Sequence, residues 1–191
     1  MSGTLFYLIG ASGSGKDSLL EGCRAQLKMD DRICVAHRYI TRAPGIGGEN
    51  HVHLSEAEFA LRIELGMFAM HWDSHGYRYG IGAEVDQWLD AGANVVINGS
   101  REYLPVALGL YDELVPILVD VPAERLRARL TARGRETAAE IERRLARHEA
   151  MVAALPPDVL KISNDGPLEA GVAALVALLR QHSWLPTGHS G

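Results

Sequence analysis

The residues best suited to chemistry lie in one glycine-rich run near the amino terminus. The run consists of Gly10, Ala11, Ser12, Gly13, Ser14, Gly15, Lys16, Asp17 and Ser18. It follows the pattern G-x-x-x-x-G-K-[ST], in which backbone N–H groups surround a polyphosphate, the lysine contacts the outer phosphates and a hydroxyl binds Mg²⁺. The run predicts a nucleoside triphosphate site built from all these residues, although Asp17 stands where the hydroxyl is expected.

Asp17 calls for its own explanation, because a carboxylate beside a triphosphate repels it unless a cation lies between them. Carboxylate oxygen is a ligand that Mg²⁺ accepts. We therefore expect Asp17 to bind Mg²⁺, directly or through a water molecule. The alternative is a solvent-facing acid in the first turn of a helix, where it favours the helix dipole.

The elements around this run predict an α/β fold. An apolar strand over residues 4–9 leads into the run and a helix over 17–28 leaves it, which is the context of an anion site. Further strands are expected at 33–39, 94–98, 114–121 and 159–163, and the helices that alternate with them at 83–91, 102–110, 123–133, 138–155 and 167–182. This order predicts a P-loop NTPase of three α/β/α layers around a five-stranded parallel sheet.

A less regular stretch interrupts that alternation. Residues 41–53 contain Gly and Pro and form a candidate binding loop. Ser55 and Glu58 have capping-box spacing before a helix that Gly66 ends, and short strands are expected at 68–72 and 77–79. We therefore expect a single domain with its core at 1–36 and 83–182, a small acceptor-binding insertion at about 37–82 and a frayed tail at 183–191.

Composition limits the possible functions. The 191 residues are 47% hydrophobic and carry a net charge of −5 with a pI near 5.9, which fits one core and gives no support for binding nucleic acid or a membrane surface. No apolar run approaches a membrane span. Cys23 and Cys34 are expected to be small core residues. We expect a cytoplasmic protein.

Arginine is distributed unevenly. Eight of the sixteen arginines lie between Arg125 and Arg147, and this segment is expected to form a lid over an anion. A solvated helix face with partners such as Glu140 for Arg144 is the alternative. It is favoured for Arg125, Arg127, Arg129 and Arg147. The pairs His51 with His53 and His71 with His75 lack convincing further ligands, so no zinc site is expected.

With these elements placed, the chain resembles the guanylate kinase-like family of P-loop kinases over about 180 residues. The motifs that carry the likeness are the glycine-rich run, Thr41-Arg42-Ala43-Pro44, Gly76-Tyr77-Arg78-Tyr79-Gly80, Arg133-Gly134 with Arg144, and Ser163-Asn164-Asp165. The resemblance implies that Arg42 and Tyr79 hold the phosphoryl acceptor, that Arg133 and Arg144 clamp the transferring group, and that Asn164 borders the adenine of ATP. It also places Asn98 where relatives carry an acid near the metal.

Several positions depart from that family. Its guanine-reading groups are replaced by Met70, Ile81 and Ser100, and Gly45 replaces an arginine. Arg38 and Arg78 add cationic side chains, and guanidinium groups suit phosphate oxygens. We therefore expect Arg38, Arg42, Arg78, Tyr79 and Ser100 to bind a small acceptor with more than one phosphate and no base.

With these departures, and with Gly15-Lys16-Asp17-Ser18 in the loop and Asn98-Gly99-Ser100-Arg101 after the central strand, the chain resembles the ribose 1,5-bisphosphate phosphokinase family, which makes 5-phosphoribosyl 1-diphosphate from ATP. The resemblance implies an Mg²⁺-dependent kinase of a sugar bisphosphate, active in phosphonate metabolism. Two alternatives are a kinase of a nucleoside monophosphate such as GMP and a non-catalytic guanylate kinase-like binding module. The intact Lys16, Arg133 and Arg144 favour catalysis over a binding module.

Overall fold

The core is a five-stranded parallel sheet, as expected. The computed structural model describes residues 3–45, 49–134, 136–157 and 159–183. The sheet has the order β2-β7-β1-β8-β9, and every pairing in it is parallel. Its strands are β2 (Ile33–Val35), β7 (Asn94–Asn98), β1 (Leu5–Gly10), β8 (Leu114–Asp120) and β9 (Leu160–Ser163). The central strand β1 is buried along its whole length, because helices cover both of its faces.

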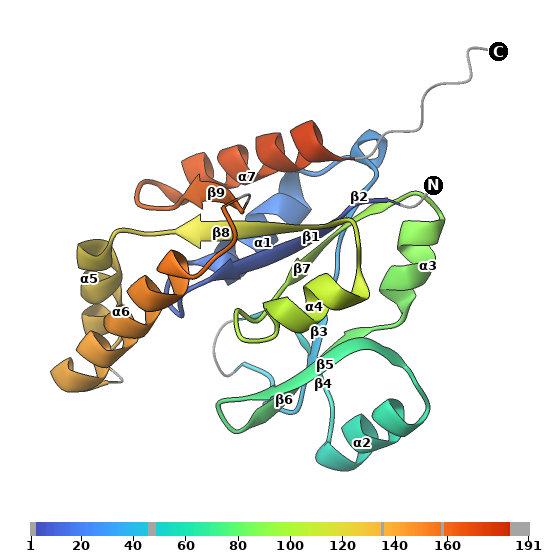
Figure 1. The fold of residues 1–191 in the computed structure, drawn as a ribbon, viewed down its shortest axis with the longest axis horizontal. Helices are drawn as coiled ribbons and strands as arrows, with labels where there is room; N and C mark the ends of the chain where they lie inside the picture. The colour runs from blue at the N-terminus through green and yellow to red at the C-terminus, as the bar shows by residue number, and fades with distance from the viewer. Residues whose placement is uncertain (1–2, 46–48, 135, 158, 184–191) are drawn as a thin grey trace.

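Two helical layers enclose this sheet (Figure 1). One face packs against α1 (Lys16–Gln26) and α7 (Leu168–His182) through a cluster that includes Leu19 and Leu175. The other packs against α3 (Glu84–Asp90) and α4 (Leu104–Leu110) through a cluster that includes Leu89 and Leu104. The expected three-layer α/β/α architecture is therefore confirmed. Cys23 lies in the first cluster, but Cys34 is exposed, so the expectation of a core role for Cys34 was wrong.

A second sheet occupies the expected insertion. Its order is β4-β3-β6-β5, with β3 (Arg38–Ile40), β4 (Val52–His53), β5 (Phe68–Ser74) and β6 (Tyr77–Gly82). The helix α2 (Glu56–Glu64) connects β4 to β5, and the hydroxyl of Ser55 accepts a hydrogen bond from the backbone N–H of Glu58 at its start.

The prediction of one continuous strand at 33–39 was wrong. It divides into β2, which pairs with β7, and β3, which pairs with β6. The sequence is β-prone throughout, and strand propensity does not specify which sheet a residue joins.

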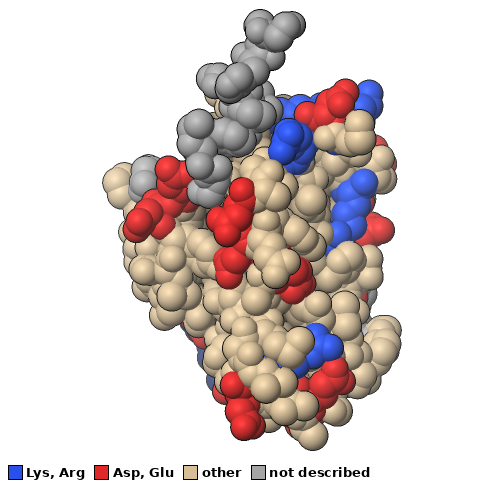
Figure 2. All heavy atoms as spheres, turned by 90° about the vertical axis from the view of Figure 1, so that its right-hand side faces the viewer, with Lys and Arg blue, Asp and Glu red and all other residues tan. Residues whose placement is uncertain are grey.

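A helical hairpin closes the remaining end of the molecule. The helices α5 (Ala123–Arg133) and α6 (Ala138–Ala153) pack through Leu126, Leu130, Ile141 and Leu145, and Ala11 of the glycine-rich run belongs to the same cluster. The face in Figure 2 is turned away from this hairpin, and acidic and basic side chains there are dispersed among uncharged ones. A short 3₁₀ turn, η1 (Met29–Asp31), follows α1.

Within the described ranges, no helix is long and apolar enough to cross a membrane. The expected frayed tail at 183–191 lies outside the described residues except for Ser183.

Candidate active site

A cavity of about 520 Å³ opens where the carboxyl ends of the central strands meet the second sheet. Seven residues of the glycine-rich run line it: Gly10, Ser12, Gly13, Gly15, Lys16, Asp17 and Ser18. Five further residues expected to contact substrates also line it: Arg38, Arg42, Tyr79, Ser100 and Arg133. The fold therefore brings together most of the residues expected to bind the two substrates.

The glycine-rich run forms a loop whose backbone conformation requires glycine at two positions. Gly13 and Gly15 have φ angles of 95° and 89°, which L side chains rarely adopt. A Cβ atom on Gly15 would lie 2.5 Å from Nδ2 of Asn164. The loop enters α1 at Lys16, so the positive end of that helix faces the cavity. This geometry suits polyphosphate.

Lys16 is the partly buried cation of the loop. Its Nζ donates hydrogen bonds to the carbonyl oxygens of Gly10 at 2.8 Å and Ala11 at 3.2 Å. Burial lowers the pKa of Lys16 to about 8, because charging an amine away from water is costly. A polyphosphate in the cavity would stabilise its charged form.

Two expected members of the loop lie elsewhere. Ser14 is fully buried behind the loop, and Ala11 lines a second cavity of about 330 Å³ on the side of α5 and α6. The carbonyl of Ser14 accepts a hydrogen bond from Nδ2 of Asn164 at 2.6 Å and one from Nη1 of Arg129 at 3.3 Å. Asn164 therefore braces the loop through its side chain, in addition to any contact with adenine.

Arg129 was expected on a solvated helix face, and that expectation was wrong. Its Nη2 donates to the carbonyl oxygen of Asn164 at 2.7 Å, so it ties α5 to the two turns that surround the nucleotide site. The available signal was its spacing of four residues from Arg133, which places both on one side of α5.

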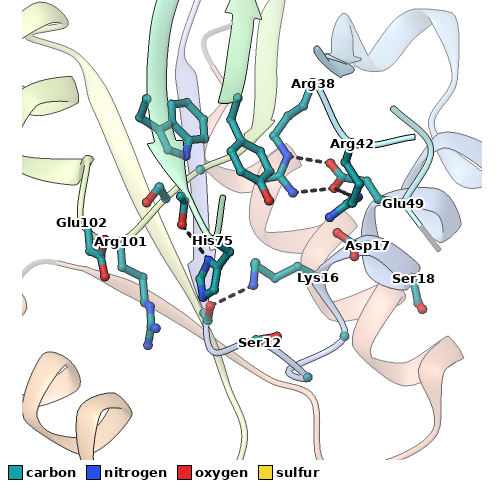
Figure 3. A pocket seen from close by; sticks show the side chains of 18 of the residues that line it. Ser12, Lys16, Asp17, Ser18, Arg38, Arg42, Glu49, His75, Arg101 and Glu102 are labelled. Carbon is teal, nitrogen blue, oxygen red and sulfur yellow. Dashed lines mark hydrogen bonds and ion pairs between the residues drawn. The ribbon is translucent and has the colours of Figure 1, made fainter. Parts of the chain in front are cut away.

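The acceptor side of the cavity contains a buried ion-pair cluster (Figure 3). Nε and Nη2 of Arg38 each lie 2.6 Å from an oxygen of Glu49, and Nη2 of Arg42 lies 3.2 Å from Oε2. Burial opposes ionisation of Glu49, but the hydrogen bond and charge of Arg38, with the charge of Arg42, outweigh it and hold the pKa of Glu49 below its usual value. The sequence analysis did not identify Glu49.

The aromatic side chains of Trp72 and Tyr79 line the cavity next to this cluster. The guanidinium of Arg38 lies 5.0 Å from the ring centroid of Tyr79, and Tyr79 stacks on Trp72. Met70 and Ile81 are paired in the β5–β6 register and are both buried. Neither Met70 nor Ile81 is among the residues that line the cavity, and neither side chain would form a hydrogen bond with a base.

Arg78 does not join this site, contrary to expectation. Its Nε lies 3.4 Å from Oδ1 of Asp73, and its guanidinium lies over the ring of Phe59 from α2. Successive side chains of a strand point to opposite faces. Because Tyr79 faces the cavity, its neighbour Arg78 lies on the other face of the second sheet.

The loop after β7 is held firmly beside the cavity. The hydroxyl of Tyr7 donates to the carbonyl of Ser100 at 2.9 Å and accepts from its N–H at 3.0 Å. Gly99 lies so close to the Tyr7 ring that a Cβ atom there would collide with it. Ser100 and the next residue, Arg101, are therefore presented to the cavity by a braced backbone.

Asp17 lies beside Asn98 at the end of β7. Nδ2 of Asn98 donates to Oδ1 of Asp17 at 2.8 Å, and Oδ1 of Asn98 is a buried atom with no hydrogen-bond partner in the described part of the chain. Carboxylate and amide oxygens are hard ligands of the type Mg²⁺ prefers. The pair fits an ion that takes its other ligands from phosphate and water. No group of three His, Cys, Asp or Glu side chains that could hold a metal occurs among the described residues.

The arginines of α5 and α6 divide between surface and cavity. Arg127 pairs with Glu142 on the surface, as expected. Arg147 is exposed, as expected, and it also borders the second cavity together with Arg144. The alternative considered for Arg144, an ion pair with Glu140, does not occur in the described structure. Glu140 instead caps α6 by accepting hydrogen bonds from the backbone N–H and the hydroxyl of Thr137. Nη1 of Arg144 lies 2.5 Å from Oε1 of Glu136.

Comparison with known proteins gives a consistent picture. No family model matches the chain. It is 51% identical over 175 residues to ribose 1,5-bisphosphate phosphokinase PhnN of Desulfomicrobium baculatum, covering 92% of this chain and 93% of that protein. It is 53% identical over 178 residues to the protein of the same name from Thiobacillus denitrificans, covering 93% of each.

A solved structure agrees on the fold. The guanylate kinase of Anaplasma phagocytophilum superposes with a TM-score of 0.70 at 18% identity, over 94% of this chain and 86% of that one. Together with the site geometry, the two relatives place the sequence in a defined group of kinases. The chain belongs to the ribose 1,5-bisphosphate phosphokinase family.

Proposed function

We propose that this chain transfers the γ-phosphoryl group of ATP to the 1-phosphate of ribose 1,5-bisphosphate, giving 5-phosphoribosyl 1-diphosphate and ADP. The observation that carries the proposal is the identity of about half the residues to relatives of that name over more than 90% of the chain. Arg38 and Arg42 line the cavity, and the buried Met70 and Ile81 of the same sheet carry no group that would hydrogen-bond a base. This combination suits an acceptor that has phosphates and no base.

The reaction needs no strong general base. The second pKa of a phosphate monoester is about 6, so the attacking oxygen is largely ionised at neutral pH. This oxygen forms a bond to the γ-phosphorus while the bond from that phosphorus to the bridging oxygen breaks, and the bonding electrons leave with ADP. The work of the protein is alignment and charge neutralisation.

The chain's own groups divide that work. The backbone N–H groups of residues 13–18 and the amine of Lys16 bind the β- and γ-phosphates of ATP. Arg38, Arg42 and Tyr79 hold the 1-phosphate in line with the γ-phosphorus, and Ser100 borders the sugar. From α5 and α6, Arg133 and Arg144 contact the transferring group.

Mg²⁺ would be held on the protein side by Asp17 and Asn98. When bound, it neutralises charge on the β- and γ-phosphates. Asp17 and Asn98 form a hydrogen-bonded pair, and the unpartnered Oδ1 of Asn98 supports a ligand at this point. Asp17 would thus supply the charge that Asn98 lacks.

Two mobile parts complete the proposal. The segment 125–147 acts as a lid that closes over ATP, and the insertion at about 37–82 carries the acceptor toward it. Closure would exclude water that otherwise hydrolyses ATP.

A product-identified assay tests the function. Purified protein with ATP, Mg²⁺ and ribose 1,5-bisphosphate should release ADP and 5-phosphoribosyl 1-diphosphate in equal amounts, whereas GMP should be a poor acceptor. Lys16→Met serves as the inactive control. A higher kcat/KM with GMP would establish the nucleoside monophosphate kinase instead, and no turnover with either acceptor would favour a binding module.

A further inference from the structure

Arg101, the last residue of the Asn98-Gly99-Ser100-Arg101 run, lies where the two cavities meet. Arg101 lines both the main cavity and the second cavity beside α5 and α6. Figure 3 shows its side chain extending from the loop after β7, on the other side of Lys16 from Arg38 and Arg42. The charges of Arg101 and Arg38 both act on Lys16. Arg101 is therefore part of the same electrostatic site.

Arg101 lacks the carboxylate partner that its neighbours have. Arg38 and Arg42 share Glu49, and Arg144 pairs with Glu136. Within the described residues Arg101 forms no ion pair, and its buried Nη1 has no hydrogen-bond partner. Buried hydrogen-bond donors in folded proteins nearly always have an acceptor. The acceptor for this guanidinium is therefore expected to come from a bound ligand.

The surroundings of Arg101 call for an anion. Burial lowers the pKa of Arg101; the charge of Glu102 partly offsets this, and the charges of Arg147 and Arg144 lower it further. Arg144 and Arg147 line the second cavity with Arg101, and Lys16 lines the main cavity, while Glu102 lines both. Cationic groups therefore outnumber this carboxylate at the junction of the cavities. A phosphate dianion would compensate this charge and accept the fork of hydrogen bonds that a guanidinium donates.

The position of Arg101 indicates which phosphate this is. Lys16 and the loop serve ATP, and the cluster of Arg38 and Arg42 is suited to one phosphate of the acceptor. Arg101 follows Ser100 on the braced loop, so it reaches the cavity from the side on which the sugar would lie. We propose that Arg101 binds the acceptor phosphate that does not react, the 5-phosphate, and so selects a bisphosphate over a monophosphate. This inference rests on the proposed function.

The role of Arg101 is tested by combining an enzyme variant with a substrate analogue. Arg101→Met removes the guanidinium, and ribose 1-phosphate lacks the 5-phosphate. The variant should lose roughly 100-fold in kcat/KM for ribose 1,5-bisphosphate, since truncating one partner of a buried charge pair leaves the other buried and unpaired. Ribose 1-phosphate has no 5-phosphate, so removing the Arg101 guanidinium takes away a contact that this acceptor never makes. The kcat/KM of the variant for ribose 1-phosphate should therefore stay within about twofold of the wild-type value. Arg101→Lys should restore part of the preference.

Other outcomes would overturn the assignment. Equal losses with both acceptors would place Arg101 on the transferring phosphoryl group, and no loss with either would make it a spectator. Arg127→Met is the matched control, because Arg127 is a surface arginine paired with Glu142. Urea unfolding of each variant separates a binding defect from a folding defect.

A direct binding measurement separates this inference from the function on which it rests. If the wild type fails to phosphorylate ribose 1,5-bisphosphate, the proposed function is refuted by that result alone. Calorimetric titration with ribose 5-phosphate then measures the contribution of Arg101 to binding of the 5-phosphate without any turnover. Binding at least tenfold weaker in Arg101→Met than in Arg127→Met supports the contact, and equal binding refutes it.

Discussion

Replacing Glu49 with Gln tests whether the arginines on the acceptor side depend on one buried carboxylate. The side chain of Glu49 is 8% exposed, and those of Arg38 and Arg42 are 13% and 14% exposed. Gln has nearly the same size, but it has no charge and replaces one acceptor oxygen with an N–H donor. In Glu49→Gln at least one guanidinium N–H therefore faces another donor.

The expected loss of stability follows from these contacts. A hydrogen bond to a charged group contributes about 1.5–3 kcal/mol, and breaking a buried ion pair costs about 3–5 kcal/mol. Since Gln retains one acceptor, we expect the free energy of unfolding near pH 7 to fall by about 2–4 kcal/mol. A change of this size is readily measured by urea denaturation.

A surface pair with similar geometry is the control. Arg127 lies 2.7 Å and 2.9 Å from the two oxygens of Glu142, but the side chains are 45% and 57% exposed. Solvent screens such a pair. Glu142→Gln should unfold at the same urea concentration as the wild type.

The effect of Glu49 should depend on pH in a defined direction. Its folded-state pKa lies below the ordinary value of 4.5. The stabilisation is therefore fully present above that value and is lost as the pH falls through the folded-state pKa. The difference between wild type and Glu49→Gln should stay constant from pH 7 to about pH 5 and shrink below it. A difference that is absent near pH 7, or that does not shrink in acid, would refute the reasoning.

Three further predictions concern the nucleotide side. Asp17→Asn should shift the Mg²⁺ titration of ADP formation to higher concentrations while changing the affinity for ATP less, and an unchanged titration would contradict a metal role. Because burial lowers the pKa of Lys16 to about 8 and phosphates should raise it, ATP binding above pH 8 should take up protons. Calorimetry in buffers of different ionisation heat measures this uptake, which Lys16→Met should abolish. Asn164→Ala removes the 2.6 Å hydrogen bond to the Ser14 carbonyl, so the KM for ATP should rise with little change in the KM for the acceptor. A rise confined to the acceptor KM would be inconsistent with that brace.

The nucleotide half of the site could be predicted from the sequence because its signals are local. The strand, the glycine spacing and the lysine between Gly10 and Ser18 occupy a few consecutive residues, and their backbone geometry follows from residue type. The alternation of strands and helices likewise predicted the parallel sheet, since each element carries its own periodicity. The two-residue strand β4 left no such signal.

The acceptor half depended on tertiary structure. Arg78 looked like a ligand by composition, but strand alternation at Tyr79 turned it to the far face. Glu49 had no motif, and it acquires a role only because β3 and the loop before β4 bring it against Arg38. In the same way, Arg129 resembles other arginines of its helix in the sequence, and only packing brings it against the carbonyls of Ser14 and Asn164.

The sequence by itself therefore determined the fold class and the phosphate loop, because those depend on interactions within short segments. Only the tertiary structure decided which charged groups are paired and which lack a partner. The pairing of a charged group, with a carboxylate or with a backbone carbonyl, depends on distance and desolvation between residues far apart in the chain, as in the 115 positions that separate Arg129 from the Ser14 carbonyl to which it donates.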